Sequence, residues 1–144
     1  MKKRFVIHEH HATRLHFDLR LEMAGVLRSW AVPKGPSMNP ADKRLAVLVP
    51  DHALSYGNFE GTLAEGTYGA GEVRIWDSGK YETASDPAEQ FAEGKIVFTF
   101  IGKKLKGEFA LVKMAKQKKN WLLIKANDEF ADSSWKLKTV LEVS

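Results

Sequence analysis

Residues 16–32 read HFDLRLEMAGVLRSWAV, and this stretch decides the fold. Its first half alternates strictly between polar and apolar side chains, which is the period of a β-strand with one buried face. Ala24 and Gly25 separate this half from a second apolar run over 26–32, so the stretch predicts a β-hairpin. The polar side chains that would share one face of the first strand are His16, Asp18, Arg20 and Glu22.

The rest of the chain continues this pattern of short strands separated by turn residues. Pro50 is expected to end a strand that begins at Arg44, and Gly79 is expected to open a turn after a strand that begins at Glu72. Further strands are predicted over 96–101, 105–112 and 121–125, and a glycine-rich stretch runs from Gly57 to Gly71. This pattern predicts a mostly β fold: a single-domain, closed or nearly closed β-barrel with one short helix.

The short helix has signals at both of its ends. Asp86 is the expected N-cap, Pro87 suits the first helical position, and Glu89 has the spacing of a capping box. Gly94 is expected to end the helix. The four tryptophans, Trp30, Trp76, Trp121 and Trp135, are expected in the core.

Two segments near the C-terminus have weaker signals. The cluster Lys113–Lys119 is expected to be a solvated turn rather than a specific nucleic-acid contact. The segment Asp128–Ser144 matches no pattern, and it either packs Trp135 onto the barrel or adds a strand that closes it.

Composition excludes several classes of protein. The chain has 144 residues and no cysteine, which excludes disulfides, iron–sulfur clusters, cysteine-ligated zinc and a thiolate nucleophile. No apolar run approaches the roughly 20 residues of a membrane span, and no signal peptide is evident, so we expect a cytoplasmic protein without membrane contact. The net charge of +4 permits a polyanionic partner without requiring one.

Histidines concentrate beside the alternating strand. His16 and Asp18 project from one face about 6.5 Å apart by strand rise, and His10 could fold back through the turn at residues 12–13 as a third ligand. Two imidazoles and a carboxylate suit Mn2+, Fe2+ or Zn2+ in an open site. The spacing alone fits a metal site and a polar strand face equally well. His8 and His11 are expected at the surface or behind the ligands.

Basic side chains flank these histidines. Arg20 and Arg14 present planar guanidinium groups that match phosphate oxygens, and a cation beside arginine suits phosphoryl chemistry. Arg20 and Glu22 would alternatively form a salt bridge on an exposed sheet. His52 and Tyr56, in a predicted loop, would add a proton donor and a hydroxyl if they lie near the cluster.

Six ordered blocks of this sequence resemble a known family, the 3′-phosphoesterase domain of bacterial and archaeal DNA ligase D and its stand-alone relatives. The resemblance covers about residues 5–125 and is therefore far more specific than any one motif. The blocks are His10–Glu22, Leu27–Pro36, Lys43–Val47, Asp51–Tyr56, Phe59–Gly61 and Glu65–Gly71.

The resemblance implies a single β-barrel domain over residues 1–144 and a metal-dependent hydrolase, a DNA repair enzyme of non-homologous end joining. It implies Mn2+ as cofactor, with Zn2+ or Co2+ as alternatives. The expected substrates are DNA 3′ ends on a primer–template, from which a terminal ribonucleoside and then the 3′-phosphate are removed. Ligase or polymerase partners, a nucleoid-associated location and a monomer are expected.

The resemblance also implies roles for particular residues. Only nine residues precede His10, and Pro50 stands where the family often has an acidic residue, so phosphate removal is the firmer expectation. The implied metal ligands are His10, His16 and Asp18; the catalytic residues are Arg20, His52 and Tyr56; the phosphate-binding residues are Arg14, Ser29, Lys34 and Arg44; Glu22, and alternatively Arg14, would lie behind these residues.

Two other functions fit parts of the sequence. A non-haem Fe(II) oxygenase would use His16, Asp18 and His52 as a facial triad, although the basic residues suit phosphate better. A non-catalytic nucleic-acid-binding barrel of the OB type would explain the basic balance and the cluster Lys113–Lys119. It would leave the histidine and aspartate spacing unexplained.

Overall fold

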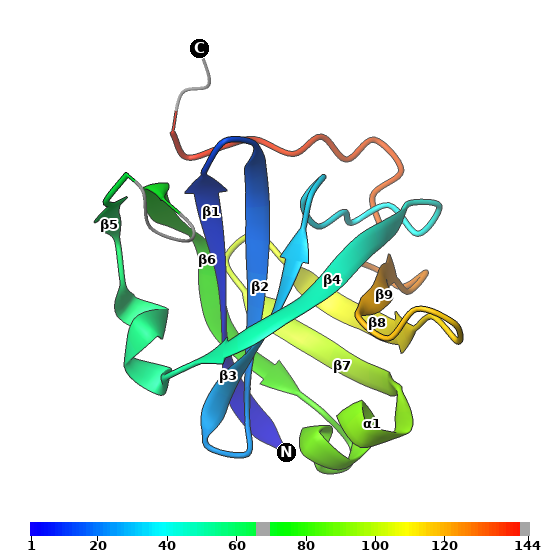
Figure 1. The fold of residues 1–144 in the computed structure, drawn as a ribbon. Helices are drawn as coiled ribbons and strands as arrows, with labels where there is room; N and C mark the ends of the chain where they lie inside the picture. The colour runs from blue at the N-terminus through cyan, green and yellow to red at the C-terminus, as the bar shows by residue number, and fades with distance from the viewer. Residues whose placement is uncertain (66–69, 142–144) are drawn as a thin grey trace.

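The computed structural model describes residues 1–65 and 70–141, and in them nine strands, a short 3-10 helix and one α-helix (Figure 1). The strands are β1 (Lys2–His11), β2 (Leu15–Met23), β3 (Val26–Val32), β4 (Lys43–His52), β5 (Gly61–Leu63), β6 (Gly71–Glu82), β7 (Lys95–Gly102), β8 (Lys106–Lys113) and β9 (Asn120–Lys125). The helices are η1 (Leu54–Asn58) and α1 (Pro87–Glu93). Of the family blocks quoted above, residues 66–69 lie outside the described residues.

All strand pairs are antiparallel, and the sheet closes on itself. The order around the ring is β1-β2-β3-β4-β9-β8-β7-β6, and β6 pairs again with β1. The short strand β5 adds to one end of β6. The expected fold class, a mostly β closed barrel with one short α-helix, is therefore confirmed.

The predicted hairpin forms at the expected place. Met23 of β2 faces Val26 of β3, with Ala24 and Gly25 as the two turn residues. Both have positive φ, 51° and 80°, which matches the twist of the flanking strands. The alternation of β2 then points its apolar side chains into the barrel, and Phe17, Leu19 and Leu21 are buried there.

Aromatic side chains fill much of the barrel interior, where burial of apolar surface supplies the main stabilising term. Trp30, Trp76 and Trp121 are buried, and Trp135 packs against the core from the C-terminal segment, so the expectation for the tryptophans is confirmed. Other large members of the core are Phe5, Phe17, Tyr81, Phe98, Phe100 and Phe109.

Two strands extend beyond their predicted ends. β4 runs through Pro50 to His52, because the pairing with β3 shifts register between Leu27 and Ser29, and such an irregularity tolerates a residue without an N–H donor. β6 runs through Gly79, where the glycine lets β7 approach: a Cβ there would lie 2.2 Å from the Ile101 carbonyl oxygen. The sequence analysis also gave no strand over Lys2–His11, which forms β1.

The helix α1 has the predicted ends. The Asp86 side chain accepts a hydrogen bond from the Ala88 N–H at 3.1 Å, and Pro87 begins the helix. Gly94 follows the last residue with a left-handed φ of 87°. The backbone N–H of Glu89 donates a hydrogen bond to the Asp86 carbonyl oxygen at 3.1 Å. None of the described helices is long and apolar enough to span a bilayer.

The C-terminal segment crosses one end of the barrel instead of adding a strand (Figure 1). The indole N–H of Trp76 donates to the Lys138 carbonyl oxygen at 2.7 Å, and the Trp135 indole donates to the Pro36 carbonyl oxygen at 3.2 Å. The buried carboxylate of Glu9 accepts from the N–H groups of Val140 and Leu141 at 2.7 and 2.9 Å. The packing expected for Trp135 is thus found, and a closing strand is wrong for the described part because β1 and β6 already close the ring.

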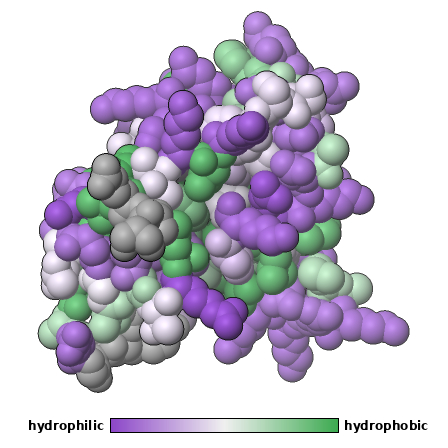
Figure 2. Space-filling model, turned by 90° about the horizontal axis from the view of Figure 1, so that it is seen from above, coloured by the Kyte–Doolittle hydropathy of each residue, from purple (hydrophilic) through white to green (hydrophobic). Residues whose placement is uncertain are grey.

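The end of the barrel that the C-terminal segment crosses has a mixed surface. Figure 2 looks onto the end that this segment crosses, and polar side chains surround patches of hydrophobic residues there. The lysine cluster lies elsewhere, in the turn between β8 and β9, where Lys116, Lys118 and Lys119 are exposed. The cluster thus lies in an exposed turn, as expected, and the absence of a nucleic-acid contact stays a prediction.

Candidate metal centre

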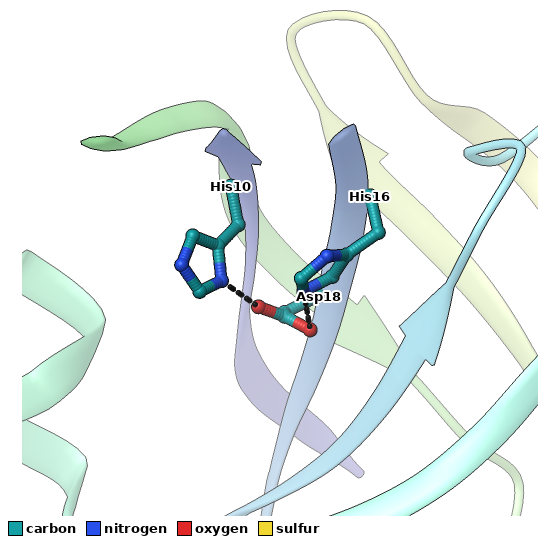
Figure 3. Close-up of side chains that lie close together, drawn as sticks. All are labelled: His10, His16 and Asp18. Carbon is teal, nitrogen blue, oxygen red and sulfur yellow. Dashed lines mark ion pairs between the residues drawn. The ribbon is translucent and has the colours of Figure 1, made fainter. Parts of the chain in front are cut away.

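Three donor side chains converge where β1 and β2 run side by side. His10 of β1 lies directly opposite His16 of β2, and Asp18 is two residues farther along the same face. The Asp18 carboxylate contacts His10 Nδ1 at 3.5 Å and His16 Nε2 at 3.2 Å (Figure 3). One donor atom from each residue lies within 4.8 Å of the others. The structure therefore brings together the three residues that the sequence proposed as ligands.

The chemistry of this cluster fits a divalent cation. Two imidazole nitrogens and one carboxylate oxygen form a donor set for Mn2+, Fe2+ or Zn2+. Asp18 and His10 are each 6% exposed, whereas the side chain of His16 is more open. Burial tends to raise the pKa of Asp18, but hydrogen bonds from His10 and His16 and the charge of Arg20 hold it well below its usual range. The carboxylate is therefore ionised and ready to bind a cation.

Arg20 continues this face of β2 and is only 3% exposed. Its Nη2 contacts the Asp18 carboxylate at 3.4 Å, its Nη1 donates to the Ser29 hydroxyl at 2.9 Å, and its Nε donates to His8 Nδ1 at 3.0 Å. Burial lowers the pKa of Arg20 and Asp18 raises it. These partners on β1, β2 and β3 fix the guanidinium beside the donor cluster, and Arg20 does not pair with Glu22.

His8 supports Arg20 from behind. Because His8 Nδ1 accepts the Arg20 hydrogen bond, its proton resides on Nε2, which donates to the Phe59 carbonyl oxygen at 3.0 Å. Burial, and then the charge of Arg20, lowers the pKa of His8 to about 4. Of the two positions expected for His8, the one behind the ligands is found and the surface position is not. His11 instead contacts the Glu9 carboxylate at 2.6 Å.

Ser29 is another hydrogen-bond partner of Arg20. Its hydroxyl accepts from Arg20 and donates its own proton to the Leu27 carbonyl oxygen at 3.0 Å. The side chain is fully buried. Its contacts are those of a residue that orients the guanidinium, whereas the family resemblance implied direct phosphate binding.

An aromatic stack borders the other side of Arg20. The rings of His52 and Tyr56 are stacked at 4.2 Å, and Tyr56 and Phe59 are stacked at 5.1 Å. The Arg20 guanidinium carbon lies 4.9 Å from the centre of the Tyr56 ring, and His8 meets the same ring edge-on at 5.3 Å. Tyr56 thus joins the stack to the arginine.

The two titratable rings of this stack are neutral near pH 7. Burial, and then the charge of Arg20, lowers the pKa of His52, while burial raises the pKa of Tyr56. His52 is the last residue of β4 rather than part of a loop, since that strand continues past Pro50. An open cleft of about 410 Å³ lies along the stack; its lining residues are His52, Ala53, Ser55, Tyr56, Asn58 and Phe59.

The sequence patterns assigned no role to two residues of this region, Arg4 and Phe59. Arg4 of β1 donates to the Leu54 carbonyl oxygen at 3.2 Å and to Asn58 Oδ1 at 2.6 Å, and so ties η1 to the barrel. Phe59 lay inside a quoted family block without a role of its own. Its ring stacks on Tyr56, three residues earlier in η1, and this i, i+3 spacing is the signal that could have found it.

Other expected site residues lie apart from this group, as far as the described contacts go. Arg14 and Lys34 are exposed, and Arg14 meets the cluster only through its carbonyl oxygen, 3.3 Å from His16 Nδ1. Arg44 contacts Asp42 at 3.4 Å. Glu22 accepts from the Arg4 backbone N–H at 3.0 Å, toward the other end of β2.

The facial triad of the oxygenase alternative required His52 next to His16 and Asp18. The group that could hold a metal ion in the described residues instead contains His10 with these two residues. His52 is stacked on Tyr56. The geometry therefore disfavours that alternative.

Comparisons with known proteins agree with the family that the sequence resembles. The model of the DNA ligase D 3′-phosphoesterase domain family matches residues 8–113. The multifunctional non-homologous end joining protein LigD of Pseudomonas aeruginosa is 46% identical over 132 residues, which cover 90% of this chain and 16% of that protein.

Two mycobacterial relatives give the same picture. LigD of Mycolicibacterium smegmatis is 46% identical over 132 residues, covering 88% of this chain and 17% of the relative. The non-homologous end joining DNA repair protein LigD of Mycobacterium tuberculosis strain H37Rv is 46% identical over 113 residues, covering 76% of this chain and 14% of the relative. The chain thus spans less than a fifth of the length of these relatives.

Proposed function

Because this chain belongs to the DNA ligase D 3′-phosphoesterase domain family, we propose that it is a hydrolase that processes DNA 3′ ends in non-homologous end joining. Its specific reaction is removal of a 3′-phosphate to leave a 3′-hydroxyl. The observation that carries this proposal is the junction of the His10, His16 and Asp18 cluster with the buried guanidinium of Arg20.

The first requirement of the reaction is a cation, which we propose to be Mn2+, held by His10, His16 and Asp18. When bound, such an ion supplies positive charge for phosphoryl oxygens and lowers the pKa of water. The ionised carboxylate of Asp18 and the adjacent imidazole nitrogens support this assignment. Zn2+ and Co2+ are the alternative ions.

The second requirement is neutralisation of the remaining phosphate charge. Arginine has five N–H donors, and Arg20 uses three of them, on Asp18, Ser29 and His8. Two donors are left for phosphate oxygens. Because the guanidinium is held by its other contacts, it needs little reorganisation when the charge of the reacting phosphoryl group develops.

The third requirement is a proton for the leaving 3′ oxygen. His52 is neutral in the free protein, since burial and the charge of Arg20 lower its pKa. A bound phosphate dianion would counter the charge of Arg20 and favour the protonated imidazole. We assign His52 as the proton donor and Tyr56, stacked on it at 4.2 Å, as the residue that orients its ring.

The proposal is tested with a 5′-labelled primer–template that ends in a 3′-phosphate, and with a twin that ends in one ribonucleotide. Metal-stripped protein is incubated with each, with and without Mn2+, and the products are separated on a sequencing gel. Conversion of the phosphate end to a 3′-hydroxyl only with Mn2+ is the expected result. Conversion of the twin would add ribonucleoside removal to the activity.

A matched pair of variants ties the activity to the cluster. His10→Gln should abolish conversion, whereas His11→Gln, which changes the neighbouring histidine outside the cluster, should retain it. Absence of conversion with every divalent metal would refute the enzymatic proposal. Tight metal-independent binding of single strands would then favour the nucleic-acid-binding barrel.

The product also suggests the next reaction. A 3′-hydroxyl is the nucleophile that a polymerase extends or a ligase joins, so we propose that the product passes to an activity of one of these classes. The names of the relatives place them in end joining, which supports this order of events.

A further inference from the structure

The cleft beside Arg20 is lined by three aromatic rings stacked on one another, called the aromatic wall below. His52, Tyr56 and Phe59 lie nearly parallel, with angles of 21° and 12° between successive rings. The other lining residues are Ala53, Ser55 and Asn58. In the free protein none of these six side chains carries a full charge near pH 7, because the pKa of His52 is lowered. The cleft therefore offers stacking surface rather than a second anion site.

Hydrogen bonds from β1 hold this wall in place. Arg4 ties η1 to β1, the strand that also carries His10, through Leu54 and Asn58. Gly57 makes this contact possible, since a Cβ there would lie 2.7 Å from the Arg4 guanidinium. His8 holds the Phe59 carbonyl oxygen at 3.0 Å. A wall fixed in advance loses little conformational freedom when a ligand binds.

We propose that this cleft binds the base of the terminal nucleotide that bears the 3′-phosphate, by stacking against the aromatic wall that includes Phe59. The inference rests on the proposed function and names its substrate subsite. The ring of Tyr56 lies both in the cleft and 4.9 Å from the Arg20 guanidinium carbon, so a phosphate on Arg20 brings its own nucleoside to the cleft.

The size and chemistry of the cleft agree with this occupant. Its volume of about 410 Å³ lies within the range of pockets for small organic groups. Every base has a π face, so stacking tolerates all four bases. We therefore expect the subsite to require a base without reading which base it is.

The test compares two primer–templates with a 3′-phosphate. In one the terminal unit is a normal nucleotide, and in the other it is a tetrahydrofuran abasic unit. The wild-type protein should prefer the normal end by about tenfold in kcat/KM, as expected for the loss of one stacked base. Substrates ending in A, C, G or T should differ by less than about threefold.

Variants of Phe59 show whether the preference arises at the cleft. Phe59→Ala should bring the ratio of the two rates close to one, and Phe59→Leu, which keeps apolar bulk without a flat ring, should also lower it. Phe130→Ala is the matched control, because Phe130 is exposed on the C-terminal segment. It should keep the wild-type ratio.

A second measurement does not depend on turnover. A 2-aminopurine placed at the terminal position of the 3′-phosphate strand is quenched when it stacks, and metal-free protein keeps the strand intact. Quenching with wild-type protein that is lost with Phe59→Leu supports the subsite.

The outcomes separate the inference from the function on which it rests. Equal rates on normal and abasic ends, or no quenching, overturn the stacking subsite and leave the phosphatase proposal standing. Absence of conversion of either end by wild-type protein refutes the phosphatase, and the inference falls with it.

Discussion

Arg20 and Ser29 are joined across β2 and β3 by a hydrogen bond of 2.9 Å in which the guanidinium donates and the fully buried hydroxyl accepts. A hydrogen bond to a charged group contributes about 1.5–3 kcal/mol. Ser29→Ala should therefore lower kcat/KM for 3′-phosphate removal by about tenfold or more, mainly through kcat, while Mn2+ affinity is unchanged. Ser37→Ala removes another buried serine, one bonded to Asp42, and is the control that should keep kcat.

Metal binding should be visible as stabilisation. A ligand at a hundredfold excess over its Kd stabilises the folded state by about 2.7 kcal/mol, so Mn2+ should raise the Tm of the wild-type protein by several degrees. Asp18→Asn removes the charge of the carboxylate and should abolish this rise. Asp132→Asn, at an exposed aspartate, should preserve it. An unchanged Mn2+ effect in Asp18→Asn would contradict the ligand assignment.

Asp77 is a buried carboxylate with a structural role that is separate from the cluster. It accepts from the backbone N–H groups of Lys103, Lys104 and Leu105 at 2.8–3.1 Å, and so holds the turn between β7 and β8 against β6. Asp77→Ala leaves these donors without their partner and should cost about 3 kcal/mol or more of unfolding free energy. Urea denaturation measures the loss, and Mn2+ affinity of the folded variant should stay normal.

Tyr81 should make the protein sensitive to alkali. Its hydroxyl donates to the Glu22 carbonyl oxygen at 2.6 Å, and burial, followed by the charge of Glu22, raises its pKa well above the ordinary value. The unfolded chain loses this proton near pH 10, whereas the folded protein keeps it. The stabilisation is therefore complete below pH 10 and decreases as the pH rises above it.

The matching variant isolates this effect. Tyr81→Phe should be less stable than the wild type at pH 7, by about 1 kcal/mol for the lost hydrogen bond. Its unfolding free energy should then fall less steeply than that of the wild type between pH 9 and 11. Parallel pH profiles of the two proteins would contradict the role of this phenol.

Local patterns in the sequence were sufficient to predict much of the barrel. The alternation over His16–Met23 and the turn at Ala24 and Gly25 gave the β2–β3 hairpin, and the signals at Asp86 and Gly94 gave α1. The strand β1 was not predicted because both of its faces are covered in its second half: Ile7 is in the core, and His8, Glu9 and His10 are also buried, so no simple alternation results.

The part of the site that lies within one hairpin could be predicted from the sequence. His10, His16 and Asp18 belong to one hairpin, so their spacing foretold their grouping. Phe59 and Tyr56 are three residues apart in η1 and its C-cap, a spacing that brings side chains together in a 3-10 turn, so their contact is local. The place of this pair beside Arg20 is not local, because it depends on η1 folding back against β1. Pro50 and Gly79 misled the prediction because an irregular pairing and a close strand approach override the usual preferences of these residues.

The closure of the ring by β1 and β6 has a consequence for how the protein folds. Lys2 pairs with Glu82, so the first strand finds its second neighbour only after more than half of the chain has been made. Pairings of such long sequence separation are slow to form. The hairpin with the donor cluster can assemble early, but its β1 side stays an open edge until β6 arrives. We expect folding to be limited by this seam, with the donor cluster present before the barrel that encloses it.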